Sequence, residues 1–174
     1  MILFRHVDPR YPFLWETPDQ PSARWHEVGD GPVHYLSDTP DGAWAEFLRH
    51  EEITDPGDLA GVERTMWAVD IAQPPNRRSG LPHQVVTGGP DTYARCRRYA
   101  GRLRAEGEPG FSVEGAALLP GEARGWHVDN GLKPGQDCNG RVLVLFGSRP
   151  DLTGCPAAIA GRPPSYLLER VRYY

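Results

Sequence analysis

The sequence predicts a single compact domain of the α+β class, spanning residues 1–174 and built on a central, mostly antiparallel sheet. The length of 174 residues suits one domain and is enough to bury a core. Segments with strand character outnumber helical ones and do not alternate with them, which argues against a regular parallel arrangement. The 20 glycines and 18 prolines divide the chain into short elements joined by many turns.

The first part of the chain predicts two strands separated by a long loop. Residues 2–7 (ILFRHV) form a short apolar-rich run that indicates the first strand. The aromatic segment 10–23 is interrupted by prolines and is therefore expected to be a loop. The turn GDGP at 29–32 precedes a second short strand at 33–36.

A helix is predicted directly after the second strand. Thr39 is a suitable N-cap and Pro40 fits the first helical position, so the helix is expected to run to residue 53. The spacing of three and four residues places four side chains on one face of this helix: Ala43, Glu46, Phe47 and His50.

The middle of the chain predicts a short helix at 55–65, a strand at 65–71 and an amphipathic helix at 90–107. The expected buried stripe of the amphipathic helix is Tyr93, Cys96, Ala100 and Leu103. The arginines on its other side are Arg95, Arg98 and Arg102. They are interpreted as a solvated face, with docking of an acidic partner as the alternative.

The last third predicts two further strands, at 113–119 and 140–147. Residues 165–174 (SYLLERVRYY) fit either a final strand or a short helix.

Composition excludes several classes of protein. The net charge of −4 and the pI of about 5.8 disfavour nucleic acid as a main partner, because phosphate binding needs a basic face. No apolar run approaches the roughly 20 residues of a membrane helix, and no signal peptide is recognisable, so a cytoplasmic location is expected. Three widely spaced cysteines fit a reducing compartment better than a disulfide framework.

The common catalytic and metal-binding motifs are not found. HEE at 50–52 lacks the second histidine of a zinc protease, and His127, Asp129 and Cys138 match no standard zinc spacing. TGGP at 87–90 is neither a phosphate-binding loop nor a dinucleotide fingerprint. We therefore expect no metal site.

Residues 22–50 contain an unusual combination of a cation, an aromatic ring and a carboxylate. Arg24, Tyr35 and Glu46 lie 11 residues apart on a predicted loop, strand and helix. Composition alone favours ordinary positions for them: a surface arginine, a half-buried strand residue and a solvated helix residue. However, Glu46 shares its helix face with small and apolar residues, where a carboxylate is unfavourable unless it has partners or a ligand.

The same segment resembles the RES domain family, which is named for Arg, Glu and Ser. The matching motifs are Arg24-Trp25 after an N-terminal loop, Tyr35-Leu36-Ser37 on a strand, and Ala43-Trp44-Ala45-Glu46 on the following helix. The segments MWAVDI and RVLVLFGSRPD are similar to later strands of that family, so the resemblance covers most of the chain.

This resemblance implies a fold related to the ADP-ribosyltransferases and an activity that degrades NAD+ at the nicotinamide–ribose bond. Many members are toxins of toxin–antitoxin pairs, so an antitoxin is an expected partner, and a homodimer stays open. In this interpretation Glu46 stabilises the positive charge on ribose, Arg24 holds phosphate and Tyr35 contacts nicotinamide. NAD+ is the substrate and no other cofactor is expected.

The family serine is the clear departure from the pattern. The best local match is VEGAALL, in which Gly115 stands at the serine position and Glu114 at the preceding proline. Ser112 and Ser148 are nearby serines, and Glu114 or Glu122 could supply an acidic group instead. Besides NAD+ hydrolysis or phosphorolysis, two alternatives stay open: transfer of ADP-ribose to a small molecule or protein, and a module that binds a nucleotide without turning it over.

Overall fold

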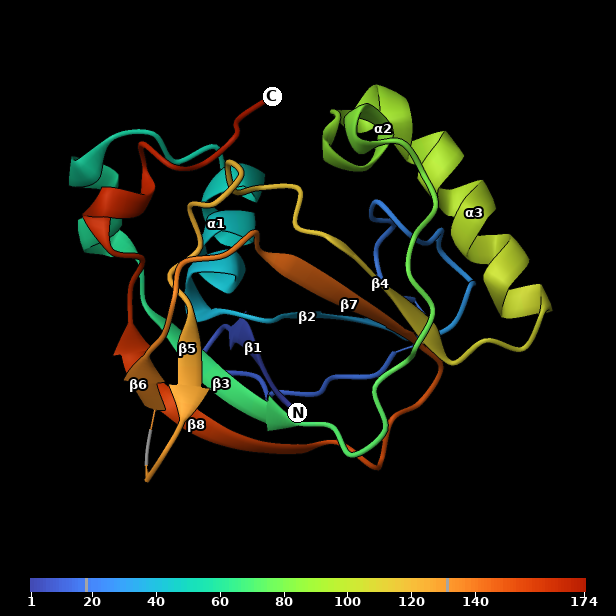
Figure 1. Cartoon of the computed structure of the whole chain (residues 1–174), viewed down its shortest axis with the longest axis horizontal. Helices are drawn as coiled ribbons and strands as arrows, with labels where there is room; N and C mark the ends of the chain where they lie inside the picture. Colours follow the sequence, from blue (N-terminus) through green and yellow to red (C-terminus); the bar gives the residue numbers. More distant parts are fainter. Residues whose placement is uncertain (18, 131) are drawn as a thin grey trace.

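The computed structural model describes residues 1–17, 19–130 and 132–174, and its main feature is a six-stranded sheet (Figure 1). The strand order is β4-β7-β2-β1-β3-β8, and every neighbouring pair is antiparallel. The α+β class and the antiparallel sheet are therefore confirmed.

The first half of the chain contains β1 (Ile2–Val7), β2 (Val33–Ser37) and β3 (Arg64–Asp70), close to the three predicted ranges. The predicted loop at 10–23 contains no helix or strand, and Pro18 within it lies outside the described residues. β1 runs beside β3 over six residue pairs but meets β2 at a single pair, Phe4 with Ser37. The sheet consequently opens between β1 and β2.

Helix α1 (Pro40–His50) begins as the sequence predicts. The Thr39 hydroxyl accepts a hydrogen bond from the Gly42 amide at 3.0 Å, and Pro40 occupies the first turn. The helix ends at His50 rather than at the predicted residue 53, because Glu52 adopts a positive φ of 54°. A 3₁₀ helix, η1 (Pro56–Gly61), replaces the second predicted helix.

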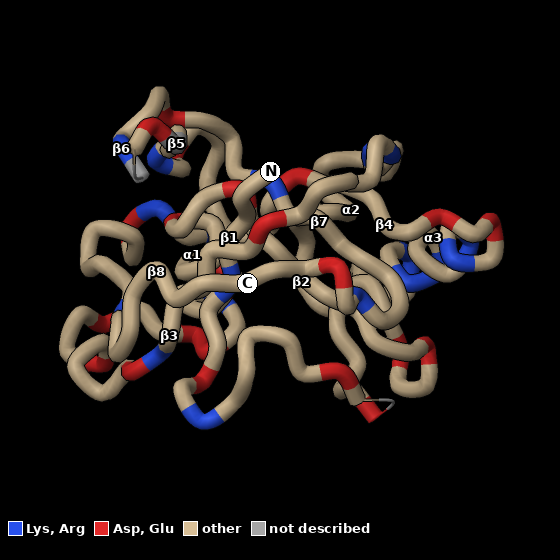
Figure 2. Tube along the Cα trace, turned by 90° about the horizontal axis from the view of Figure 1, so that it is seen from below, with Lys and Arg blue, Asp and Glu red and all other residues tan. Residues whose placement is uncertain are grey.

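A second helical unit lies at the other end of the sheet (Figure 1). It comprises α2 (His83–Thr87), the 3₁₀ turn η2 (Pro90–Thr92) and α3 (Tyr93–Ala105). The buried stripe of α3 includes Tyr99 with three of the predicted residues, whereas Tyr93 is only partly buried. Figure 2 shows basic residues along α3. Arg95 and Arg98 are exposed, and Arg102 lies 3.7 Å from Glu106 in an ion pair.

The later strands differ from the prediction in one instructive place. β7 (Arg141–Phe146) is confirmed, but its partner β4 covers Gly110–Glu114 and not 113–119. The predicted strand is wrong beyond Glu114: the Gly115 amide still bonds to Gly140, just before β7, but the amides of Ala116 and Ala117 bond to a side chain of α1. Gly110 begins β4 at φ 153°, and a Cβ there would lie 2.3 Å from the Val144 carbonyl oxygen.

Further short elements complete the chain. The edge strand β8 (Thr153–Gly161) pairs with β3 and was not predicted, nor was the small hairpin of β5 (Trp126–Val128) and β6 (Leu132–Pro134). Residues 165–174 contain the 3₁₀ turn η3 (Ser165–Leu167), so the helical alternative is the correct one. Among the described residues, no helix has both the length and the apolar character needed to span a bilayer.

Three hydrophobic clusters fill the interior. The α1 cluster includes Phe4, Trp44, Leu48, Met66 and Leu167. The α3 cluster includes Trp25, Leu103, Phe111, Val144 and Phe146. The third cluster includes Leu3, Leu36, Val69, Ile71 and Leu145. Because side chains alternate along strands, the α1 and α3 clusters occupy one face of the sheet and the third occupies the other. The two helical units therefore cover the same face.

His6 is held in its neutral form between α1 and the sheet. Its ring stacks on Trp44 at 5.9 Å and meets Phe47 edge-on at 5.0 Å, and its Nδ1 accepts a hydrogen bond from Arg64 at 3.3 Å. Burial, together with the charges of Arg64 and Arg5, lowers the pKa of His6 from 6.5 to about 3.

We therefore expect the protein to lose stability as the pH falls from about 6.5 toward 3. In that window the unfolded chain binds a proton at residue 6 that the folded protein resists, with a slope of up to about 1.4 kcal/mol per pH unit. Thermal melts at several pH values should show a shallower acid slope for His6→Asn than for the exposed control His127→Asn. Identical slopes would show that His6 is not the group responsible.

Candidate active site

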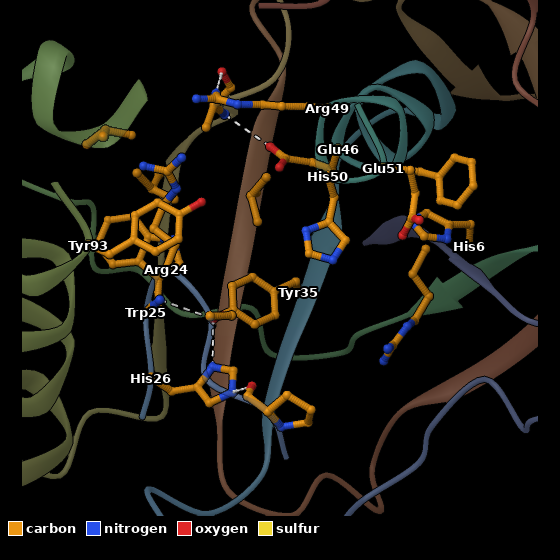
Figure 3. Close-up of a pocket in the computed structure, with 18 of the residues that line it drawn as sticks. His6, Arg24, Trp25, His26, Tyr35, Glu46, Arg49, His50, Glu51 and Tyr93 are labelled. Atoms are coloured by element: carbon orange, nitrogen blue, oxygen red, sulfur yellow. Dashed lines mark hydrogen bonds between the residues drawn. The ribbon is translucent and has the colours of Figure 1, made fainter. Parts of the chain in front are cut away.

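Arg24, Tyr35 and Glu46 line a single cavity of about 500 Å³ (Figure 3). This cavity lies between the two helical units, and side chains of both the α1 and the α3 clusters contribute to its wall. Its size is within the usual range for small-molecule sites. The fold thus brings together three residues that the sequence singles out, although they come from a loop, a strand and a helix.

Glu46 projects from α1 into this cavity and is anchored by backbone amides. Its Oε1 accepts hydrogen bonds from the amides of Ala116 at 3.1 Å and Ala117 at 3.3 Å. No described residue donates a hydrogen bond to Oε2. The carboxylate is therefore not a solvated helix position: one oxygen is fixed by the protein and the other is available to a ligand.

Tyr35 contributes its ring to the cavity, while its hydroxyl is used by the protein. His26 lies 2.8 Å from the Pro21 carbonyl through Nε2 and 2.8 Å from the Tyr35 hydroxyl through Nδ1. Because burial lowers the pKa of His26, the ring is neutral, and the carbonyl requires the proton to be on Nε2. The Tyr35 hydroxyl consequently donates to Nδ1, and it accepts from the Trp25 amide at 3.2 Å. Burial also raises the pKa of Tyr35, so it is a poor proton donor or acceptor for chemistry.

Arg24 is buried rather than a surface residue, with 9% of its area exposed. Its guanidinium donates to the Gly88 carbonyl at 2.9 Å and lies 4.6 Å from the centre of the Tyr93 ring. These contacts attach the loop before β2 to the turn between α2 and η2. Arg24 therefore has a structural role as well as a place in the cavity wall.

Three other arginines line the cavity that the sequence did not single out: Arg5, Arg49 and Arg64. Arg49, on α1, is 2% exposed and donates to three backbone carbonyls. Its only signal in the sequence is its position three residues after Glu46, on the same helix face.

The second missed arginine, Arg5, lies on β1 just beyond the single pair with β2. Its Nε and Nη1 are buried and have no hydrogen-bond partner among the described residues. Burial lowers its pKa to about 10. Buried N–H donors without a partner are costly, and the Arg5 guanidinium adds positive charge to this end of the cavity. Nothing in the sequence distinguishes Arg5 from an ordinary strand residue.

The segment after β4 does not place a hydroxyl in the cavity. Ala116 lines the cavity, whereas a Cβ on Gly115 would face the Gly140 carbonyl oxygen at 3.1 Å. The Ser112 hydroxyl accepts from Arg141 at 2.6 Å, and the Ser148 hydroxyl donates to Glu16 at 2.5 Å. Neither of these serines lines the cavity.

Of the two glutamates that could replace the family serine, only one lines the cavity. Glu114 lines the cavity and lies 2.8 Å from His83, while Glu122 forms an ion pair with Arg170 at 3.3 Å outside it. Within residues 1–17, 19–130 and 132–174, no three side chains of His, Cys, Asp or Glu are grouped to hold a metal ion.

A family model decides the classification. The model of the RES domain matches residues 2–166 of the 174. The chain belongs to the RES domain family. No curated protein matches its sequence.

This RES domain is also similar to a solved structure. The crystal structure of the M. tuberculosis MbcT–MbcA toxin–antitoxin complex contains a chain that superposes with a TM-score of 0.62 and 14% sequence identity. The match covers 97% of this RES domain and 86% of that chain. At this identity the likeness concerns the fold.

We expect Tyr35→Phe to destabilise the protein while keeping the ring in the cavity wall. Loss of the hydroxyl leaves the Trp25 amide and Nδ1 of His26 without their partner, and an unsatisfied buried polar group costs about 1–3 kcal/mol. Denaturant unfolding of this variant beside Tyr11→Phe, whose side chain is exposed, measures the difference. Equal stabilities of the two variants would contradict the hydrogen bonding described for Tyr35.

Proposed function

We propose that this RES-domain protein degrades NAD+ by cleaving the bond between nicotinamide and ribose, as the toxin of a toxin–antitoxin pair. The observation that carries the proposal is Glu46, whose carboxylate is fixed through Oε1 and directs Oε2 toward a cavity of suitable size. Membership of the RES family and the likeness to a chain from a toxin–antitoxin complex support the same function.

The charge of the cavity suits a dinucleotide. Four arginines contribute to its wall, against three glutamates: Arg5, Arg24, Arg49 and Arg64, and Glu46, Glu51 and Glu114. Burial keeps His6 and His26 neutral, so they do not alter this balance near neutral pH. The diphosphate of NAD+ carries two negative charges and is a natural partner for guanidinium groups. Arg5 adds its positive charge to the same wall, although its Nε and Nη1 are themselves buried.

Glu46 supplies the catalytic stabilisation in this proposal. When nicotinamide departs, it takes the bonding electron pair, and positive charge develops on C1 and the ring oxygen of the ribose. A fixed carboxylate near that ribose stabilises the transition state more than the ground state, because NAD+ itself has no such charge on the sugar. The amides of Ala116 and Ala117 keep the carboxylate in place, so little reorganisation is needed during the reaction.

The reaction balances without an oxidant or reductant. Nicotinamide leaves as a neutral base, and an acceptor oxygen forms the new bond to C1 while losing a proton to solvent. Water as acceptor gives ADP-ribose, and phosphate gives a phosphorylated ADP-ribose. NAD+ is the substrate, and this chemistry calls for no additional cofactor.

Tyr35 contributes an apolar wall and excludes water in this scheme. Its hydroxyl is engaged by Trp25 and His26, so only the ring surface is free to contact the flat nicotinamide. Such contact aligns the leaving group with the cavity, and the raised pKa of Tyr35 argues against a role in proton transfer.

One observation favours a second candidate, a RES-domain protein that binds a nucleotide with little turnover. Ala116 borders the cavity beside Glu46, so the 114–117 segment offers no side-chain hydroxyl there. Transfer of ADP-ribose to a small molecule or protein would use the same cleavage step with a different acceptor. The release of nicotinamide separates cleavage from binding alone, and the identity of the ADP-ribosyl product separates hydrolysis from transfer.

Glu46→Gln is expected to lower nicotinamide release by about a hundredfold or more, while NAD+ affinity changes only a few-fold. The amide keeps the shape and still accepts hydrogen bonds from residues 116 and 117, but it removes the negative charge that faces the ribose. The rate of nicotinamide release, the NAD+ affinity by calorimetry and the melting temperature are to be measured on one preparation.

The matched control is Glu51→Gln. Glu51 caps the end of α1 and borders the same cavity, but it is exposed and receives no anchoring from residues 116 and 117. Its amide variant should release nicotinamide at nearly the wild-type rate. A Glu46→Gln protein that melts normally and turns over normally would remove Glu46 from the mechanism.

A further inference from the structure

Arg49 lies one helical turn after Glu46 on α1. Glu46 accepts hydrogen bonds from the amides of Ala116 and Ala117, whereas Arg49 donates to the carbonyl of Ala116. We infer that Arg49 is a positioning residue, which fixes the carboxylate of Glu46 for cleavage by holding the carbonyl of Ala116. The inference rests on the proposed function for its kinetic consequence. Its structural part concerns the loop itself and can be tested without turnover.

The contacts of Arg49 are unusual for an arginine in a charged cavity. Its Nη1 donates to the Ala116 carbonyl at 2.5 Å, and its Nη2 donates to the carbonyls of Thr87 at 2.9 Å and Gly88 at 3.0 Å. The guanidinium also lies 4.3 Å from the centre of the Tyr174 ring. One side chain of α1 thus joins the end of α2 to the segment that follows β4.

The Ala116 residue is held at both of its backbone groups. Its amide donates to Glu46, and its carbonyl accepts from Arg49 and, at 3.0 Å, from Nη1 of Arg172. Ala117 is held similarly, because its amide donates to Glu46 and its carbonyl accepts from the Arg172 amide at 2.6 Å. The Ala116 carbonyl and the Ala117 amide belong to one planar peptide unit, so the groups that bind this carbonyl also orient one of the two amides that anchor Glu46.

Arg49 performs this task without neutralising the carboxylate. No described ion pair within 4.0 Å joins Arg49 to Glu46, although the two charges are near enough to influence each other. The guanidinium donates its hydrogen bonds to carbonyls and not to Oε2 of Glu46, so this oxygen is not neutralised by Arg49. A direct ion pair would offset the negative charge that the ribosyl cation requires.

The location of Arg49 is costly in isolation. Its side chain is 2% exposed, its Nε has no hydrogen-bond partner in the described part of the chain, and burial and the nearby charge of Arg24 lower its pKa. An apolar side chain would fill this space without desolvating a cation. However, an apolar side chain could not bind three carbonyls at once. One of these carbonyls belongs to Ala116, whose amide binds Glu46.

The kinetic test is a double-mutant cycle between Arg49→Lys and Glu46→Gln. Lysine keeps the charge, but its single nitrogen cannot hold the carbonyls of residues 87, 88 and 116 in the same fork geometry. Arg49→Lys should lower kcat by about tenfold to a hundredfold with KM changed only a few-fold, since a misplaced group slows chemistry. In the double variant kcat should be no lower than in Glu46→Gln alone, because Arg49 acts through Glu46.

Arg170→Lys is the matched control. Arg170 lies in the C-terminal segment, two residues before Arg172, and pairs with Glu122 away from the cavity, so its variant should keep the wild-type kcat in both backgrounds. If Arg49→Lys does not fold, Arg49→Gln replaces it in the cycle, because glutamine keeps an N–H donor without burying a charge. If the double variant instead loses kcat by the product of the two single losses, the inference is overturned, because an arginine that acts independently of Glu46 gives independent effects.

The second readout needs no turnover and separates this inference from the proposed function. Hydrogen exchange of the Ala116 and Ala117 amides, measured by NMR, should be roughly tenfold faster in Arg49→Lys than in wild type, because their alignment with Glu46 is weakened. The Arg170→Lys protein should show wild-type exchange at both amides. Unchanged exchange at both residues in Arg49→Lys would overturn the inference even if the enzyme is active. Faster exchange in a protein that releases no nicotinamide would support the anchoring and count against the proposed cleavage.

Discussion

The hydrogen bonds from the amides of Ala116 and Ala117 to Glu46 are the interaction on which the rest of the site depends. They fix one oxygen of a carboxylate on the cavity side of α1 and leave the other oxygen open. They also divert the chain away from β7 after β4: the Gly115 amide still bonds to Gly140, just before β7, but the amides of Ala116 and Ala117 are used by a side chain and cannot continue the ladder. A single constraint thus sets both the end of a strand and the geometry of the candidate catalytic group.

The surrounding arginines are arranged around the same constraint. Arg49 and Arg172 bind the carbonyl behind the anchoring amide, and Arg24 and Arg49 share the carbonyl of Gly88. Three of these guanidiniums thus stabilise loops that cover the sheet, whereas Arg5 has buried donors with no partner among the described residues. A cavity built in this way holds its own shape and still keeps positive charge for an anionic ligand.

The sequence predicted the local elements well and the long-range contacts poorly. Thr39 and Pro40 define the start of α1 through neighbouring residues alone, and β1, β2 and β7 are compact apolar runs. β8 (TGCPAAIAG) contains a proline and few β-branched residues, and it forms a strand because β3 offers a free edge. Glu46 was recognisable because a carboxylate on an apolar face needs a partner. The importance of Arg49 depends on carbonyls 38 and 67 residues away in sequence, which no local pattern records.

The central claim is that the anchored carboxylate of this RES-domain protein faces a ribose from which nicotinamide departs. The most direct test is to incubate the purified protein with NAD+, with and without phosphate, and to quantify the products by mass spectrometry. We expect free nicotinamide in one-to-one proportion with an ADP-ribosyl product, and the mass of that product identifies the acceptor. If NAD+ binds to the protein but is recovered intact under both conditions, Glu46 does not serve cleavage of the nicotinamide–ribose bond.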